Sequence, residues 1–140
     1  MKEFWNTIQF AFAAIGGWLD WFLGGCDGLL IALILFAVTD YITGFMCAVA
    51  DKKLSSAVGF KGICRKVLIF IMVGIANALD IYVLNHAGVL RTAIIFFYIS
   101  NEGLSLVENS VHLGLPVPDK LKEVLEQLHD RESTDMKEDK

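Results

Sequence analysis

Long apolar stretches, each interrupted by one or two charges, dominate the first 118 residues of the chain. Residues 28–50 contain Asp40 as their single charge, and residues 67–90 contain Asp80 as theirs. A helix needs about 20 apolar residues to cross the hydrocarbon core of a bilayer. Both stretches meet this length, so the pattern predicts membrane-spanning helices at 28–50 and 67–90.

Two further stretches are weaker candidates for spans. Residues 92–113 are apolar but include Glu102 and Glu108, and residues 4–23 carry several polar side chains and two glycines. If 4–23 crosses the bilayer, the protein has four spans; if it lies in the outer interface, it has three. Trp5 at one end of 4–23 and the Trp18/Trp21 pair at the other are typical interface anchors, which favours a span. The expected fold is an all-α membrane protein with three or four transmembrane helices in a membrane domain of residues 1–118.

A charged tail follows this domain. The segment 114–118 contains Pro116 and Pro118, which end a helix, and Asp119 can cap a new one. Apolar residues then recur at helical spacing, which predicts an amphipathic helix at about 119–130 within a tail of residues 119–140. Of the 28 charged residues of the chain, 13 lie in its last 22, so the remainder is unusually apolar.

Composition and motifs argue against several classes of function. The net charge of −4 argues against nucleic acid as a partner. The three cysteines are odd in number and lie in or beside apolar runs, which favours free thiols, and the three histidines are isolated from them and from each other. No metal-ligand spacing, phosphate loop or nucleophile elbow occurs, so the sequence predicts no enzyme activity, no cofactor and no metal site. Residues 23–26 loosely resemble a lipoprotein cleavage site, but Asp20 and the lack of a positive amino-terminal region argue against cleavage.

The loop at 51–66 sets the expected orientation. It contains one acid and five cations: Lys52, Lys53, Lys61, Arg65 and Lys66. The positive-inside rule places such a loop in the cytoplasm, and the C-terminal tail is then cytoplasmic too. A role of the same loop in binding lipid headgroups is compatible with this assignment.

Polar side chains form stripes on the apolar helices. At 100° per residue, one arc of about 120° on the 92–113 helix holds Tyr98, Asn101, Glu102, Ser105, Glu108, Asn109 and His112. Asp40, Gly44 and Ala48 share a side of the 28–50 helix, where the two small residues allow close approach of another helix. Such stripes either pack inside one small bundle or face water once several subunits assemble. Arg91 is the only cation between Lys66 and Lys120, so the four carboxylates Asp40, Asp80, Glu102 and Glu108 need further partners.

Five linked motifs between Gly24 and Leu128 resemble the toxin-secretion/phage-lysis holin family. They are Gly24-Gly25-x-Asp27-x-Leu29-Leu30, Asp40-Tyr41-Ile42-Thr43-Gly44, Leu54-Ser55-Ser56-x-x-Gly59-x-x-Gly62-Ile63-x-Arg65-Lys66, Asn101-Glu102-Gly103-Leu104-Ser105-Leu106-x-Glu108-Asn109 and Gly114-Leu115-Pro116-Val117-Pro118-x-x-Leu121-Lys122.

The resemblance implies a protein that oligomerises in the bacterial cytoplasmic membrane. It then opens timed lesions that release an endolysin or a toxin and lead to lysis of the host cell. Its partners would be the lipid bilayer, further copies of itself and, functionally, the endolysin or toxin. The residues that we expect to pack helices or line the lesion are Asp40, Gly44, Asp80, Glu102, Ser105, Glu108 and Asn109. The alternatives are a small proton- or ion-conducting protein that relays protons along its carboxylates, and a non-pore membrane component of a regulatory complex.

Overall fold

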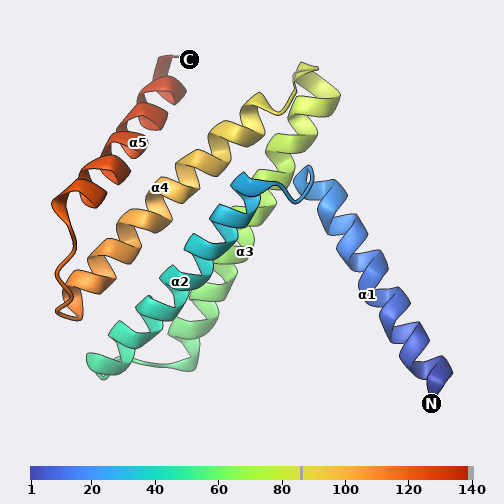
Figure 1. Cartoon of the computed structure of the whole chain (residues 1–140), viewed down its shortest axis with the longest axis horizontal. Coiled ribbons are helices and arrows are strands. Elements are labelled where there is room, and N and C mark those ends of the chain that lie inside the picture. The colour runs from blue at the N-terminus through green and yellow to red at the C-terminus, as the bar shows by residue number, and fades with distance from the viewer. Residues whose placement is uncertain (86, 139–140) are drawn as a thin grey trace.

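The computed structural model describes residues 1–85 and 87–138, and all regular structure in these ranges is helical (Figure 1). The elements in chain order are α1 (Lys2–Leu23), α2 (Gly28–Ala50), α3 (Ser56–Leu79), the π-helical η1 (Asp80–Leu84), α4 (Val89–His112) and α5 (Asp119–Glu138). The all-α class predicted from the sequence is confirmed for this part of the chain.

Helices α2, α3 and α4 form the central bundle (Figure 1). Each contributes two large apolar side chains, one turn apart, to a common core of Leu30, Leu33, Ile69, Val73, Ile95 and Ile99. Leu33, Val73 and Ile95 are completely buried, one from each helix. Apolar residues at i, i+3 and i+4 lie on one side of a helix, which is why these six converge.

Side-chain caps fix where two of these helices begin. The Asp27 carboxylate accepts a hydrogen bond from the N–H of Leu30 at the start of α2, at 2.9 Å. The Ser55 hydroxyl accepts one from the N–H of Val58 at the start of α3, at 3.2 Å. Helix α3 therefore begins at Ser56 rather than at residue 67, because Ser55 supplies the cap that the first turn needs. The expected loop at 51–66 shrinks to residues 51–55, and Lys66 becomes a helical residue.

Two helical segments among the described residues are long and apolar enough to cross a membrane. They are Gly28–Ala50 and Ser56–Leu84, with mean hydropathies of 2.1 and 2.3 over their most apolar windows. The second includes η1 and ends where Asn85 adopts a left-handed conformation with φ of 52°. Three or four spans therefore stay a prediction, because α1 and α4 carry more polar side chains than these two segments.

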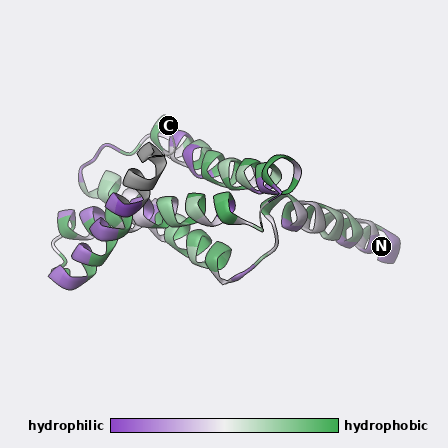
Figure 2. Ribbon diagram, turned by 90° about the horizontal axis from the view of Figure 1, so that it is seen from above, coloured by the Kyte–Doolittle hydropathy of each residue, from purple (hydrophilic) through white to green (hydrophobic). Residues whose placement is uncertain are grey.

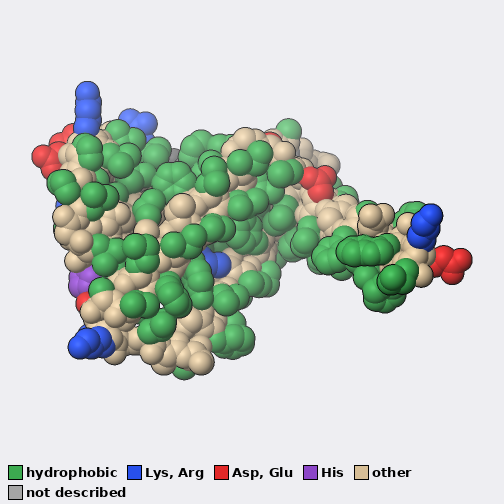
Figure 3. All heavy atoms as spheres, turned by 60° about the horizontal axis from the view of Figure 1, so that its bottom comes forward, with side chains coloured by type: hydrophobic (Ala, Val, Ile, Leu, Met, Phe, Trp, Pro, Cys, Tyr) green, Lys and Arg blue, Asp and Glu red, His purple; other side chains and the backbone are tan. Residues whose placement is uncertain are grey.

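Helix α1 extends away from the bundle (Figure 1) and buries none of its residues. Only its C-terminal end packs closely, where the ring of Phe22 lies over Gly74 of α3. The same ring stacks on Trp18 of α1, with 5.4 Å between the ring centroids. Hydrophobic side chains are spread over this arm and over the visible face of the bundle (Figure 3), and most of the bundle is hydrophobic along its length (Figure 2). Soluble proteins rarely expose such large apolar surfaces, so this surface fits contact with lipid.

Helix α5 lies alongside α4 (Figure 1). Leu125 of α5 is buried, and both its methyl groups and the ring of Phe36 of α2 lie against Gly103 of α4. A Cβ atom at Gly103 would lie 2.8 Å from a methyl group of Leu125, so a larger residue at this position would force the Leu125 side chain to shift. The sequence predicts a tail helix beginning at Asp119, but it does not indicate that this helix packs on the membrane domain.

Candidate functional site

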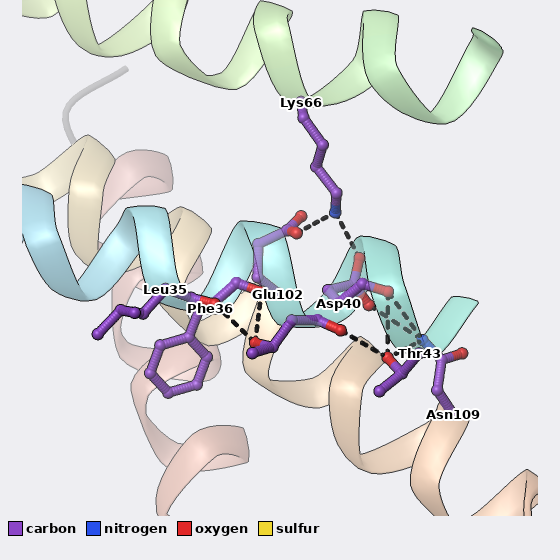
Figure 4. A network of polar contacts seen from close by, with 8 residues as sticks. Leu35, Phe36, Asp40, Thr43, Lys66, Glu102 and Asn109 are labelled. Carbon is purple, nitrogen blue, oxygen red and sulfur yellow. Dashed lines mark hydrogen bonds and ion pairs between the residues drawn. The ribbon is translucent and has the colours of Figure 1, made fainter. Parts of the chain in front are cut away.

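Charged side chains meet inside the bundle, where α2, α3 and α4 face one another. The Lys66 ammonium group of α3 donates to the carboxylates of Asp40 in α2 and Glu102 in α4 (Figure 4). Glu102 is 2% exposed and Asp40 is 9% exposed. One cation therefore serves two largely buried carboxylates, which leaves a net charge of −1 when all three groups are ionised.

An amide extends this arrangement towards the C-terminal end of α4. The side-chain nitrogen of Asn109 donates to the second carboxylate oxygen of Asp40 at 3.2 Å and to the Thr43 hydroxyl at 3.0 Å (Figure 4). Glu102 and Asn109 are two turns apart on α4, and Asp40 and Thr43 are one turn apart on α2, so helical spacing aligns each pair. We call Asp40, Thr43, Lys66, Glu102 and Asn109 the Lys66 cluster.

A partly open cleft of about 230 Å³ borders the Lys66 cluster. Besides cluster residues, its walls include Tyr41 and Gly44 of α2, Arg65 of α3 and Ser105 of α4. The walls of the cleft are partly polar, and a space of this size has room for several water molecules. Charges inside a membrane protein normally face protein or water, and here the structure offers both.

A second polar arrangement ties the C-terminal end of α1 to the start of α4. The buried Arg91 guanidinium donates to the carbonyl oxygens of Leu23 at 2.6 Å and Gly25 at 2.9 Å, and to the Asp27 carboxylate at 2.8 Å. We call these four residues the Arg91 clasp. The hydrogen bond from Arg91 lowers the pKa of Asp27 below its usual value. Gly24 lies inside the clasp with φ of 83°, and a Cβ there would clash with Arg91, so this turn requires glycine.

Asp80 caps the start of α4 beside the Arg91 clasp. Its carboxylate accepts hydrogen bonds from the backbone N–H groups of Leu90 at 3.0 Å and Arg91 at 2.8 Å. These groups belong to the first turn of α4, so Asp80 caps that helix from η1 and places a negative charge at the positive end of its dipole. Asn77, one turn earlier, donates to the carbonyl oxygen of Phe22 at 3.2 Å.

The structure brings together some of the residues expected to act jointly and separates others. Asp40, Glu102 and Asn109 meet in the Lys66 cluster, and Gly44 and Ser105 border the adjoining cleft. Asp80 lies at the other end of α3, and Glu108 is exposed. The roles of all seven residues in packing or lesion lining stay predictions. Within the described ranges, no group of three His, Cys, Asp or Glu side chains is placed to hold a metal ion.

Sequence reasoning missed the central cation of the cluster. It treated Lys66 as one of five loop cations that set topology, whereas Lys66 is helical and its side chain is only 16% exposed. The other four, Lys52, Lys53, Lys61 and Arg65, are exposed. The signal that was available is the Ser55 cap, because a helix beginning there places Gly59, Gly62 and Lys66 on one side. The function of these cations in setting orientation stays a prediction.

Comparison with known proteins identifies the family. The model of the bacteriophage holin family matches residues 17–130. The chain belongs to the bacteriophage holin family. This match confirms the resemblance seen in the five sequence motifs, and it includes both candidate spans, the Lys66 cluster and the first part of α5.

Relatives of this holin-family chain occur in bacteria and in a phage. An uncharacterized 14.9 kDa protein of Clostridium perfringens is 38% identical over 131 residues, which cover 94% of this chain and 99% of the relative. An uncharacterized Listeria innocua protein is 41% identical, over 81% of this chain and 79% of its own length. A probable holin of Bacillus phage phi105 is 40% identical, over 61% of this chain and 63% of its own length. No solved structure matches the chain.

Proposed function

We propose that this protein acts as a holin: it accumulates in the bacterial cytoplasmic membrane, oligomerises and opens timed lesions that release an endolysin or a toxin. The observation that carries this proposal is the family match over residues 17–130. The largely apolar surface and the two long apolar helical segments support it, because a bilayer is the solvent that such a surface fits. The exposed cations Lys52, Lys53, Lys61 and Arg65 favour a cytoplasmic position for the α2–α3 connection and for the C-terminus.

The Lys66 cluster supplies the physical basis for a closed and an open form. In the monomer the carboxylates of Asp40 and Glu102 are turned inward onto Lys66, so they are hidden from lipid. Removing charges from water is costly, and their mutual attraction compensates only while the geometry holds. Separation of α4 from α2 and α3 within an assembly would expose the same side chains to water. They would then line the wall of a lesion.

The packing of α5 on α4 bears on timing. Leu125 meets Gly103 near the middle of α4, and Lys122 and Glu126 lie on the exposed side of α5. A charge at bilayer depth costs about 2.5 kcal/mol or more. A charged helix is not stable beside α4 in the hydrocarbon core at that cost, so α5 has to leave α4 before this side of α4 contacts lipid or further copies. Release of α5 is therefore a step that delays lesion opening in this proposal.

Inducible expression in a bacterium, with and without a co-expressed endolysin, tests the proposal. We expect membrane potential to collapse abruptly at a reproducible time, with lysis only when the endolysin is present. Glu102→Gln and Glu108→Leu should each shift that time, because both change the polar side of α4. A culture that keeps its membrane potential and continues to grow would contradict the holin function, and unchanged timing in both variants would remove the polar side of α4 from the mechanism.

The cleft beside the Lys66 cluster favours one other candidate, a proton- or ion-conducting protein. Water in this cleft would reach the carboxylate of Asp40, which is the first requirement of a proton relay. Gradual dissipation of the proton gradient, without release of the endolysin, is the result that this candidate predicts in the same experiment.

A further inference from the structure

One surface of the bundle, formed by α3 and α4, combines two exposed charges of opposite sign with two clefts. Arg65 and Leu68 of α3 and Asn101 of α4 line a cleft of about 170 Å³. Arg65 and Ser105 line the cleft of about 230 Å³ beside the Lys66 cluster. Glu108 is three residues after Ser105 and therefore lies on the same side of α4. We call Arg65, Leu68, Asn101, Ser105 and Glu108 the Arg65 face.

Within the described part of the chain, the two charges of the Arg65 face have no partner in the same copy. Arg65 and Glu108 are both exposed. Among the described residues, no hydrogen bond or ion pair joins either side chain to another group of the chain. The neighbouring carboxylate of Glu102 is already engaged by Lys66. The monomer thus presents one cation and one anion that are available to another molecule.

The positions of the two charges along the bundle fit a symmetric pair of copies. Lys66 contacts Glu102, so Arg65 lies at about the level of residue 102 of α4. Glu108 is six residues further along α4, an offset of about 9 Å along the helix axis. Arginine and glutamate side chains extended towards each other bridge such an offset between adjacent helices. In a two-fold arrangement each copy contributes both partners, so the same contact forms twice.

Building on the holin function proposed above, we propose that the Arg65 face is a self-association surface on which Arg65 of one copy pairs with Glu108 of a second copy. The occupant is a second copy of this chain because the face is complementary in charge to itself. Polar side chains at or near the membrane are stabilised by partners from neighbouring helices. Ser105 lies between the levels of the two charges, and Asn101 lies beside Arg65, so both can contribute hydrogen bonds. The apolar Leu68 supplies packing at the same surface.

Reversing the two charges tests this pairing. The full chain, labelled with donor or acceptor dyes at its C-terminus, is placed in vesicles of phosphatidylglycerol and phosphatidylethanolamine, and energy transfer is followed against protein density. Arg65→Glu and Glu108→Arg should each require about tenfold more protein for half-maximal transfer, the loss typical of one close charge pair. The double variant Arg65→Glu/Glu108→Arg should return to within about threefold of the wild type.

A matched control separates specific pairing from net charge. Arg65→Glu/Glu123→Arg has the same net charge as the rescuing double variant, but Glu123 is an exposed residue of α5. The proposal would be overturned if this control restored association to the wild-type level. It would also be overturned if both single variants associated as strongly as the wild type. If a charge-reversal variant loses helical content, the neutral variants Arg65→Gln and Glu108→Gln are used instead. The proposal then requires that the double neutral variant associates no more weakly than either single neutral variant.

Dye release from the same vesicles distinguishes a failure of the Arg65 face from a failure of the proposed holin function. Wild-type chains that release dye, together with single variants that associate normally, would refute the Arg65 face and leave the holin function intact. Wild-type chains that associate through Arg65 and Glu108 but keep the vesicles sealed would support the face and refute the holin function.

Discussion

Replacing Lys66 by methionine is the most informative single change in the charged cluster. Methionine keeps the length and apolar volume of the lysine stem but removes the cation that Asp40 and Glu102 share. The side chains of these two carboxylates are 11% and 3% exposed, so water compensates them poorly. Breaking a buried ion pair by removing one partner typically costs about 3–5 kcal/mol, and we expect Lys66→Met to lie in this range.

The free energy of unfolding in detergent micelles, followed by far-ultraviolet circular dichroism, measures this cost. Lys61→Met is the matched control, because Lys61 lies on the same helix but is exposed, and its replacement should cost about 0.5 kcal/mol or less. The triple variant Lys66→Met/Asp40→Asn/Glu102→Gln, which is uncharged and can retain hydrogen bonds, should recover most of the loss. Equal unfolding free energies for Lys66→Met and the Lys61 control would refute the idea that Lys66 holds the bundle together.

Three further predictions concern the contacts of α1 and α5. Gly74→Ala would place a methyl group against the ring of Phe22, which would have to move, so thermal unfolding should show a loss of about 1–3 kcal/mol. An unchanged unfolding temperature would contradict this packing. Because Arg91 lowers the pKa of Asp27, the clasp stabilises the fold fully above the ordinary pKa of 3.8 and loses that contribution as the pH falls through the lowered value. The wild type should therefore become easier to unfold by denaturant below about pH 4, and Asp27→Asn should show a smaller change over that range. Identical dependence of the unfolding free energy on pH in the two proteins would exclude the clasp. Leu125→Asp should release α5 and bring lysis forward in time. Later or unchanged lysis would contradict the proposal that α5 delays lesion opening.

Much of the helical architecture follows from local sequence. The apolar run after Asp27 and the proline-ended segment before Asp119 mark the starts of α2 and α5, because capping and helix breaking depend only on neighbouring residues. Helix α3 begins eleven residues before the start that the sequence predicts, because the charges of 51–66 indicate a loop whereas Ser55 caps a helix within this segment. The helix also ends before the predicted position, because the apolar sequence continues past Asn85, where the backbone turns.

The site was less accessible to sequence reasoning because its contacts are long-range. Projection of single helices places Glu102 and Asn109 on one side of α4 and Asp40 on the polar side of α2, but it does not predict that these two sides meet, as they do in the Lys66 cluster. Projection of single helices does not show which side of α3 faces Asp40 and Glu102, so the sequence does not predict their contact with Lys66. Arg91 was recognised as an isolated cation, but its bond to Asp27 spans 64 positions of sequence and depends on how α1 and α4 meet.

Release of a protein-sized cargo from sealed vesicles tests the central claim most directly. Purified full-length protein is reconstituted at increasing density into phosphatidylglycerol-containing vesicles that hold both a small dye and a fluorescent protein of endolysin size. The account predicts that both cargoes stay inside at low density and leave together above a threshold density, because lesions require assembly. Vesicles that retain the protein cargo at every density, whether or not protons or dye escape, would contradict it.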